Sequence, residues 1–251
     1  MEFFFILLFC VALYFFLKHK WKKDNPEARK DGKKVLSINY DDSSTGFKHY
    51  LVFDTETDGL PIDPKGDPND VENWPRIVQL CWMILDSDFK LVDLKNHYIK
   101  TDFEINQEAI NIHGITNEHV QENGIPIAQA LTEFMEDLET TEILIAHNLD
   151  FDVPIIDAEL LRLGKKKRLF RKRKICTLRY GSGLTKKFGT FRRFPKLTYL
   201  CTCIYGGNEI DFTSHDARQD VILTGKIFEQ LVKHDFVKEQ WIKPKEKKAK
   251  A

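Results

Sequence analysis

The stretch HYLVFDTETDGL, residues 49–60, decides how the rest of the chain is interpreted. Its first half is apolar and rich in β-forming side chains, which predicts a buried strand. Asp54 and Glu56 follow two residues apart, and because side chains along a strand alternate faces, both carboxylates point the same way. Two like charges held side by side repel unless a cation lies between them. The stretch therefore indicates either a cation site or a solvated strand end that turns at Gly59.

Apolar patterning in the rest of the chain predicts an α/β fold. Strands are expected at residues 49–54, 76–85, 90–100 and 142–147, with the second and third joined as a hairpin. Helices are expected at about 105–112, 126–138, 151–163, 196–205 and 215–232. Hairpin strands followed by alternating strands and helices imply a mixed central β-sheet flanked by helices, and ligands of such sheets gather at the carboxyl ends of strands.

The segment 61–75, between the first two expected strands, is rich in proline and acidic residues. It is either a mere insertion or a surface loop beside the carboxyl edge of the sheet, with Trp74 packed beneath it.

Composition and charge set the broad class of the protein. The 251 residues, 42% of them hydrophobic, suffice for one catalytic-size domain with extensions. The formal net charge of +0 hides an asymmetry, because residues 162–196 hold fifteen Lys or Arg and no Asp or Glu. One region therefore suits polyanions and the other suits cations. The five cysteines show no spacing typical of structural zinc or of a disulfide framework, and they fit a reducing compartment.

The N-terminus is predicted to be a membrane-anchor helix. Residues 3–17 are unbroken apolar, and because a lysine-rich segment follows rather than precedes them, an anchor is favoured over a cleaved signal peptide. Such a helix is short for a bilayer, but snorkelling lysines and local thinning can close the gap. The positive-inside rule then leaves the bulk of the chain in the cytoplasm, and without a span a soluble cytoplasmic protein is expected. The expected parts are an anchor at 1–21, a polar tether at 22–47, a folded domain at 48–235 and a basic tail at 236–251.

Two further segments carry carboxylates at the edge of apolar elements. In EILIAHNLDFDVPII, residues 142–156, Asp152 opens a helix, and in SHDARQDVILTGKIF, residues 214–228, His215 begins a helix that has Asp220 just over one turn in. Each acid alone is typical of a helix N-terminus. Together with the first pair, however, four converging carboxylates would cost several kcal/mol, which hard divalent ions such as Mg²⁺ or Mn²⁺ would offset. Two such ions stabilise the attacking and leaving oxygens of phosphodiester hydrolysis, and a histidine can take the proton from the attacking water.

The motifs FDTETDGL, AHNLDFD and HDARQD, in this order, resemble the three exonuclease motifs of the DnaQ-like DEDD family, and IHGIT at 112–116 strengthens the resemblance. The resemblance covers about residues 48–232. It implies a ribonuclease H-like fold, two bound Mg²⁺ and 3′ to 5′ hydrolysis of nucleic acid that gives nucleoside 5′-monophosphates, as in proofreading subunits of the DNA polymerase III epsilon type. Because His215 stands five residues before the last Asp of the third motif, the chain is identified as a member of the DEDDh branch.

The same resemblance assigns roles to single residues. Thr57 and Leu60 match positions that approach the terminal nucleotide, through the backbone amide of the former and the side chain of the latter. Asp150 and Asp216 are neighbouring acids that the phase of the motifs does not select. The implied catalytic set is His215 as general base, with the metal ligands Asp54, Glu56, Asp152 and Asp220.

The basic run KKKRLFRKRK, residues 165–174, is open to several interpretations. It can be a solvated face, a localisation signal, a track for phosphates or, in a tethered chain, a contact for anionic lipid. A cationic rim beside an acidic site would hold a polyanion. Stacking surfaces for single strands are added by Arg192, Arg193, Phe188, Phe191 and Phe194.

We therefore expect a membrane-tethered, Mg²⁺-dependent 3′ to 5′ exonuclease that acts on single-stranded or frayed DNA ends. An exoribonuclease that trims RNA or oligonucleotides is the alternative within the same chemistry, because recognition of the 2′-hydroxyl depends on a few contacts that the sequence does not place. A non-catalytic nucleic-acid-binding module on the same fold is the alternative of another class. The presence of all five motif residues disfavours it.

Overall fold

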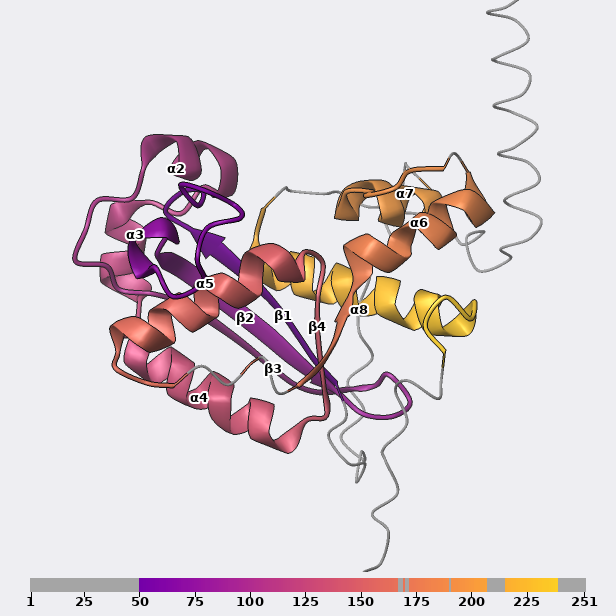
Figure 1. The fold of residues 1–251 in the computed structure, drawn as a ribbon, viewed down its shortest axis with the longest axis horizontal. Coiled ribbons are helices and arrows are strands. Elements are labelled where there is room, and N and C mark those ends of the chain that lie inside the picture. Colours follow the sequence, from indigo (N-terminus) through magenta and orange to yellow (C-terminus); the bar gives the residue numbers. More distant parts are fainter. Residues whose placement is uncertain (1–49, 167–168, 170–171, 190, 207–214, 239–251) are drawn as a thin grey trace, which may run out of the picture.

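The computed structural model describes residues 50–166, 169, 172–189, 191–206 and 215–238. A mixed sheet forms its centre, made of β1 (Tyr50–Thr57), β2 (Ile77–Leu85), β3 (Leu91–Tyr98), β4 (Ile143–Ala146) and β5 (Arg173–Cys176). The five strands are ordered β3-β2-β1-β4-β5. Figure 1 labels β1 to β4. β2 is antiparallel to both β1 and β3, whereas β1, β4 and β5 run parallel to one another. The carboxyl ends of these three parallel strands therefore meet at one edge.

Strand β1 is buried on both faces because it lies in the middle of the sheet. Leu51 and Phe53 belong to one hydrophobic cluster, and Tyr50 and Val52 belong to the cluster on the opposite face. The alternation continues past these residues. The carboxylates at positions 54 and 56 therefore point to the face of Val52, and the threonine between them points to the other face.

Helices cover both faces of the sheet (Figure 1). One face packs against α4 (Ile127–Thr140) and α5 (Leu149–Arg162). The other packs against α6 (Thr177–Phe188), α7 (Leu197–Tyr205) and α8 (Ala217–Lys233).

Helix α8 lies close against the sheet because a glycine removes the side chain at the contact. A Cβ added at Gly225 would lie 2.0 Å from Met83 Cε. At the start of the helix Asp216 is the N-cap, whose side chain accepts a hydrogen bond of 3.0 Å from Arg218 N. The cap fixes the first turn of α8, which carries Asp220.

Two short helices form one end of the molecule. α2 (Gln107–His113) ends at Gly114, whose φ of 73° is the left-handed conformation that glycine adopts easily, and α3 (Asn117–Asn123) follows. They enclose a small hydrophobic cluster of their own around Val78.

The long connection between β1 and β2 contains the 3₁₀ helix η2 (Val71–Asn73). Trp74 is 4% exposed, and its Nε1 donates a hydrogen bond of 3.2 Å to Asp67 O. The indole thus packs beneath the loop, as one of the two interpretations of segment 61–75 predicted.

The predicted α/β architecture, a mixed sheet flanked by helices, is confirmed. The four expected strands correspond to β1–β4, and the five expected helices correspond to α2, α4, α5, α7 and α8. α3, β5 and α6 were not predicted. Strand β5 overlaps the end of the basic run, so two of its four residues are cations. Helix α6 has few apolar residues and two glycines, which lower its helix propensity.

The predicted anchor at 1–21 and the tether at 22–47 lie outside the described residues, as does most of the basic tail. Among the residues that are described, no helix combines the length and the apolar character needed to cross a membrane. At the C-terminal side, Val237 is buried and its backbone N–H donates to Leu231 O at 3.0 Å. The packed part of the chain therefore reaches at least that residue.

Candidate active site

The four acids singled out in the sequence come together at the carboxyl edge of the sheet. Asp54 and Glu56 lie near the carboxyl end of β1. Because β4 is parallel to β1, the connection after β4 begins at the same edge, and it leads into α5 with Asp152 in the first turn. Asp220 lies in the first turn of α8, which packs on the face toward which Asp54 and Glu56 point.

Burial and mutual repulsion favour the protonated form of each acid. Burial, followed by the charges of Asp152, Asp220 and Glu56, raises the pKa of Asp54 well above its ordinary value. Burial also raises the pKa of Glu56 to about 8, with Asp220 and Asp152 adding to the effect. For Asp220, burial and the nearby Asp216 raise the pKa to about 6. Since Asp54 senses the charge of the other three acids, the four form one cluster.

Asp152 is tied to β1 by a side chain that sequence reasoning missed. Thr55 Oγ1 donates a hydrogen bond of 2.8 Å to Asp152 Oδ1, and Asp152 is only 3% exposed. Burial raises the pKa of Asp152 to about 7, although the hydrogen bond from Thr55 opposes the shift. The threonine between the two carboxylates of β1 thus positions the third carboxylate from the opposite face.

His215 joins the cluster from the residue just before the α8 cap. Ligand atoms of Glu56, His215 and Asp220 all lie within 4.8 Å of one another. His215 is exposed and has a φ of 62°, a left-handed conformation that is uncommon outside glycine and that tends to occur at functional sites. Asp54 and Asp152 lie outside this tight group, and they are coupled to it through their charges.

Gln79 holds the start of α8 in place. It lies opposite Glu56 on β2, and its Nε2 donates a hydrogen bond of 3.0 Å to Asp216 Oδ1, while its Oε1 accepts one of 3.3 Å from Ala217 N. At 1% exposure the amide has little freedom to move. Gln79 was not predicted to belong to the site. Its position as the polar residue of the apolar strand IVQLCWMIL could have indicated a structural or functional role.

His113, in the IHGIT motif, fixes α2 against the end of β1. Its Nδ1 accepts a hydrogen bond of 3.0 Å from Ile115 N, so Nε2 carries the proton and donates to Thr57 O at 3.2 Å. Burial, with a further contribution from His215, lowers the pKa of His113 and keeps the ring neutral. The motif therefore supports the edge of the site rather than supplying another carboxylate.

The remaining candidates divide into buried and exposed positions. Thr57 is 7% exposed and its Oγ1 donates to Gly59 O at 2.7 Å, whereas Leu60 is 82% exposed. The two neighbouring acids that the motif phase did not select have other partners, because Asp150 pairs with Arg179 and Asp216 caps α8.

The donor set of the cluster fits hard divalent cations. Four carboxylates supply only oxygen ligands, and burial first, then the charges of neighbouring acids, raises their pKa values. Mg²⁺ and Mn²⁺ prefer carboxylate and water ligands. Asp54, Glu56, Asp152 and Asp220 are therefore suited to hold such ions.

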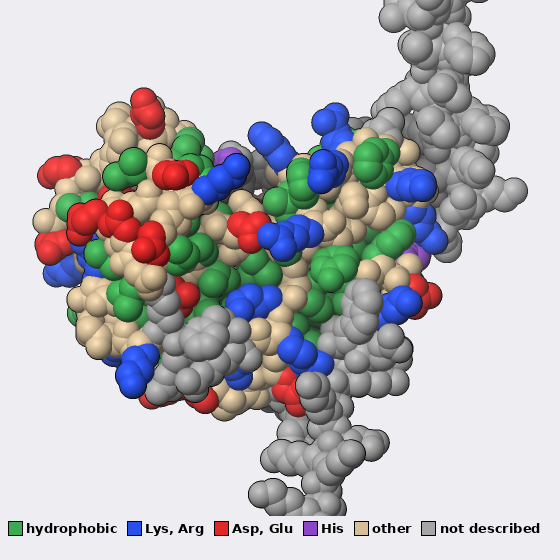
Figure 2. All heavy atoms as spheres, viewed as in Figure 1, with side chains coloured by type: hydrophobic (Ala, Val, Ile, Leu, Met, Phe, Trp, Pro, Cys, Tyr) green, Lys and Arg blue, Asp and Glu red, His purple; other side chains and the backbone are tan. Residues whose placement is uncertain are grey.

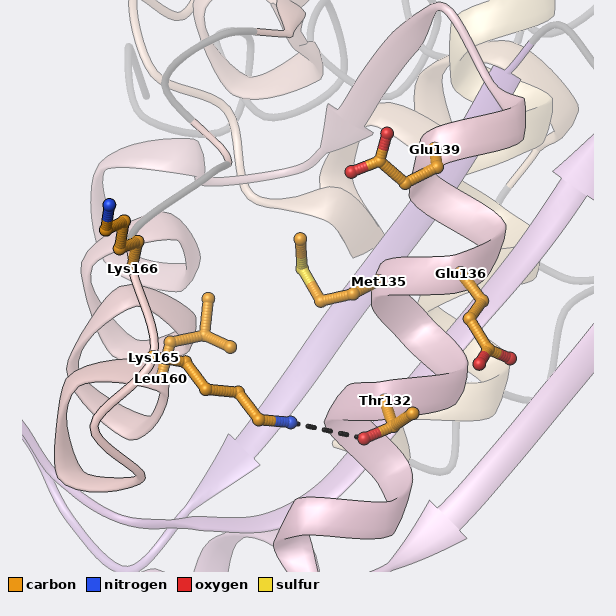
Figure 3. Close-up of a pocket in the computed structure, with 7 residues that line it drawn as sticks. All are labelled: Thr132, Met135, Glu136, Glu139, Leu160, Lys165 and Lys166. Atoms are coloured by element: carbon orange, nitrogen blue, oxygen red, sulfur yellow. Dashed lines mark hydrogen bonds between the residues drawn. The ribbon is translucent and has the colours of Figure 1, made fainter.

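The described part of the basic run 165–174 does not form one surface. Lys165 and Lys166 line a hollow of about 400 Å³ between α4 and the end of α5, where Lys165 Nζ donates to Thr132 Oγ1 at 3.2 Å (Figure 3). Leu160, which also lines this hollow, lies eight residues after Asp152 on α5, or about 12 Å along the helix. Arg173 pairs with Glu142 at 2.8 Å.

The predicted stacking surfaces are also divided. Phe191 and Phe194 are 64% and 59% exposed, and the guanidinium of Arg193 lies 5.2 Å from the ring centroid of Phe194. Phe188 instead packs against the core and against His234.

Fold and site together define an α/β domain with a carboxylate centre at the carboxyl edge of a mixed sheet. The RNase T family profile, described as exonuclease, matches residues 51–228, and the chain belongs to this RNase T/DnaQ-like exonuclease family. The resemblance inferred from the motifs is thereby confirmed.

Curated relatives include subunits of DNA polymerase III. The chain is 27% identical over 182 residues to subunit epsilon of Buchnera aphidicola, which covers 72% of this chain and 71% of the relative. It is 24% identical over 186 residues to subunit epsilon of Salmonella typhimurium, covering 74% of this chain and 72% of the relative. These similarities are distant.

Solved structures share the fold. E. coli exonuclease I in complex with single-stranded DNA has a TM-score of 0.58 and 18% identity, covering 74% of this chain and 40% of that chain. Exonuclease X in complex with 5′ overhanging duplex DNA has a TM-score of 0.52 and 18% identity, covering 77% and 96%. At these identities the likeness establishes the fold alone, and the present chain spans less than half the length of exonuclease I.

Proposed function

We propose that the protein is a metal-dependent 3′ to 5′ exonuclease that hydrolyses phosphodiester bonds at the 3′ end of DNA and releases nucleoside 5′-monophosphates. The observation that carries this proposal is the cluster of Asp54, Glu56, Asp152 and Asp220 beside His215 at one edge of the sheet. Membership of the exonuclease family supports it, as do the DNA complexes of the two structural relatives.

In this proposal the four carboxylates hold two Mg²⁺ ions, and Mn²⁺ can substitute. When bound, such ions stabilise the negative charge on the attacking and leaving oxygens of the displacement. The binding also removes the repulsion among the acids, which is the physical reason for placing them together.

His215 accepts a proton from the attacking water as the water oxygen bonds to phosphorus. The bond from phosphorus to the 3′-oxygen of the preceding nucleotide breaks, and that oxygen takes a proton from solvent. The products are a nucleoside 5′-monophosphate and a strand one nucleotide shorter. Because His215 is exposed, it can return its proton to water before the next turnover. The backbone amide of Thr57 and the exposed side chain of Leu60 orient the terminal nucleotide.

Digestion of matched oligonucleotides tests the proposal. DNA and RNA strands of one sequence, labelled at the 5′ end, are incubated with the full chain in Mg²⁺ and in EDTA, and product sizes are read over time. We expect DNA to shorten by single nucleotides from the 3′ end in Mg²⁺ alone. Faster shortening of RNA would reassign the enzyme as an exoribonuclease, and binding without hydrolysis would make it a nucleic-acid-binding module.

We also propose that the enzyme is anchored to a membrane by its N-terminal segment, with the folded domain in the cytoplasm. The apolar run at 3–17 and the lysines after it support this placement. Solubility with and without detergent, compared between the full chain and a chain that lacks residues 1–23, tests it. Equal solubility of both chains without detergent would contradict the anchor.

A further inference from the structure

A groove of about 810 Å³ opens beside the start of α5. This volume lies in the range of about 300–1,000 Å³ that ligand sites occupy. Its walls come from three places in the chain: the segment Pro64–Trp74 after β1, the first turns of α5, and the junction of β5 with α6.

The groove lies at the same edge of the sheet as the carboxylates. Because β1, β4 and β5 are parallel, the segments that follow them leave from one edge. In the first turns of α5, Asp150 and Val153 line the groove, and Asp152 of the acidic cluster lies between them in the sequence. The groove and the cluster therefore share the first turns of α5.

Cations predominate among the charged residues that line the groove. Lys65, Lys174 and Arg179 face one carboxylate, that of Asp150. Asp150 pairs with Arg179, but the two side chains are 69% and 59% exposed, so their ion pair is weak and can exchange for a phosphate. Tyr180, which is partly buried against the core, also lines the groove.

Lys174 adds a physical reason for an anionic ligand. It lies on β5, half-buried, and burial lowers the pKa of its ammonium group. A cation that has lost part of its water gains more from a bound phosphate than an exposed cation does. Of the basic run 165–174, this lysine is the described cation that lines the groove.

The distribution of charge on the surface agrees with a strand that runs from the acidic cluster toward α6. Figure 2 shows acidic side chains gathered over α2 and α3 and basic side chains over α6 and α7, on the two sides of a notch at the top of the view. A polyanion that leaves the acidic cluster toward α6 enters the more basic half of this face.

We propose that this groove binds the sugar-phosphate backbone of the single strand whose 3′ nucleotide occupies the carboxylate site. The inference rests on the proposed function. Lys65, Lys174 and Arg179 bind the phosphates upstream of the scissile bond, and Tyr180 offers a face for a base, which is the combination that single-strand grooves use. The hollow lined by Lys165 and Lys166 has no part in it.

Equilibrium binding tests the groove without any need for catalysis. Fluorescence anisotropy of a labelled single-stranded DNA is measured in EDTA at several salt concentrations. The groove variant Lys65→Ala/Arg179→Ala is compared with the control Lys165→Ala/Lys166→Ala, which loses the same charge near the remote hollow. The salt slope is the slope of the logarithm of the binding constant against the logarithm of the salt concentration. We expect its magnitude to fall by about 1.4 in the groove variant, at about 0.7 per lost phosphate contact on single strands, and to stay unchanged in the control.

Two further variants test whether the effect comes from the charge of the groove rather than from a loss of stability. Lys174→Gln removes the charge but keeps most of the length of this half-buried side chain, and we expect it to weaken binding without lowering the melting temperature. Asp150→Asn removes the one carboxylate that lines the groove, so we expect tighter binding. Equal slopes in the groove variant and the control, or weaker binding by Asp150→Asn, would overturn the proposal.

A small substrate separates this proposal from the proposed function. The nitrophenyl ester of a nucleoside 5′-phosphate reaches the carboxylate site but is too short for the groove. We expect the ratio of kcat/KM for an oligonucleotide to kcat/KM for the ester to fall about tenfold in the groove variant, through a higher KM for the oligonucleotide. Hydrolysis of both substrates with an unchanged ratio overturns the groove and leaves the exonuclease standing. If the parent protein hydrolyses neither substrate but the salt slope still falls in the groove variant, the groove is supported and the exonuclease is refuted.

Discussion

Asp54 shows how stability and function conflict at a single residue. Burial, followed by the charges of four other carboxylates, raises its pKa well above the ordinary range. Its ionised form therefore destabilises the metal-free fold. Divalent cations would reverse this effect, which is why the arrangement suits binding rather than packing.

Asp54→Asn is expected to reduce activity to the level measured in EDTA. The same change should raise the melting temperature of the metal-free protein, because it removes a buried carboxyl that must either stay ionised among other acids or take up a proton on folding. A gain of 1 kcal/mol corresponds to roughly 2–4 °C for a domain of this size. Asp88→Asn, the same change at an exposed position in the β2–β3 turn, is the control for activity and melting. Full turnover by Asp54→Asn would refute the assignment.

His215 can be a base or a ligand, and one variant distinguishes these roles. If it is the base, His215→Gln lowers kcat by about 10²–10⁴-fold while the Mg²⁺ concentration for half-maximal rate stays the same. If it is a ligand, as its distance from Glu56 and Asp220 permits, that Mg²⁺ concentration rises. We expect the first outcome. His234→Gln at the other end of α8 is the matched control. A pH–rate profile of His215→Gln that is the same as that of the parent protein from pH 5 to 9 would contradict the base role.

The sequence predicted the acids of the site but not the side chains that place them. Asp54, Glu56, Asp152 and Asp220 are recognisable because each interrupts or borders an apolar run in a familiar motif. Thr55 and Gln79 act through contacts between residues far apart in the chain, 97 and 137 positions respectively. Such pairs leave no local pattern, so only the folded structure shows them.

The same distinction holds for whole elements. The strands up to β4 were predictable because their apolar runs are long, whereas β5 has four residues, RKIC, of which two are charged. It becomes a strand because it can pair with β4 through residues such as Ile175, which registers with Ile145. Tertiary pairing therefore overrides a weak local preference at this edge. Missing β5 also concealed the groove, since one of its walls is the junction of β5 with α6.

The docking of α8 on β2 depends on the amide of Gln79, and Gln79→Ala is expected to disturb the site without removing any acid. Its contacts with Asp216 and Ala217 fix the first turn of α8. We expect kcat/KM to fall about 10–100-fold, the usual effect of removing a group that supports metal ligands, and the Mg²⁺ requirement to rise. A loss of stability alone would leave the Mg²⁺ requirement unchanged.

Two variants make this test specific to α8. Gln121→Ala serves as the control. The amide of Gln121, on α3, donates a hydrogen bond of 2.6 Å to Thr101 O, so its loss removes a comparable hydrogen bond far from the site. Gln79→Glu keeps the acceptor for Ala217 N but places another negative charge beside Asp216. We therefore expect Gln79→Glu to need more Mg²⁺ than the parent protein, as Gln79→Ala does. An equal rise of the Mg²⁺ requirement in the Gln121→Ala protein would show that the effect does not depend on how Gln79 positions α8.

At the scale of the molecule, charge is segregated so that one face can hold a polyanion and its counter-ions together. Acids gather at the carboxyl edge, while fifteen cations and no anions lie between residues 162 and 196. A net charge of +0 conceals this division. Under the proposed function, the basic part would attract a strand of nucleic acid toward the acidic centre, where bound cations would offset the repulsion between phosphate and carboxylates.

The acidic centre should also control how the stability of the whole molecule depends on pH. The pKa values of Glu56 and Asp152 are raised to about 8 and 7 by burial, so the folded protein keeps protons that the unfolded chain has released. The metal-free fold is therefore stabilised by these groups at low pH and loses that stability as pH rises toward 8. Buried His147 acts in the opposite direction, because burial lowers its pKa to about 4, but its contribution is complete above its ordinary value of about 6.5.

The window from pH 6.5 to 8 therefore isolates the carboxylates. In EDTA we expect the melting temperature to fall across this window, since each carboxyl that is protonated in the folded state alone costs up to about 1.4 kcal/mol per pH unit. With Mg²⁺ the fall should disappear, because bound cations keep the ionised acids stable. Glu56→Gln should flatten the EDTA curve, whereas Asp88→Asn should not. A melting temperature that rises with pH in EDTA, or one that responds equally with and without Mg²⁺, would show that the four acids are not mutually repulsive in the fold.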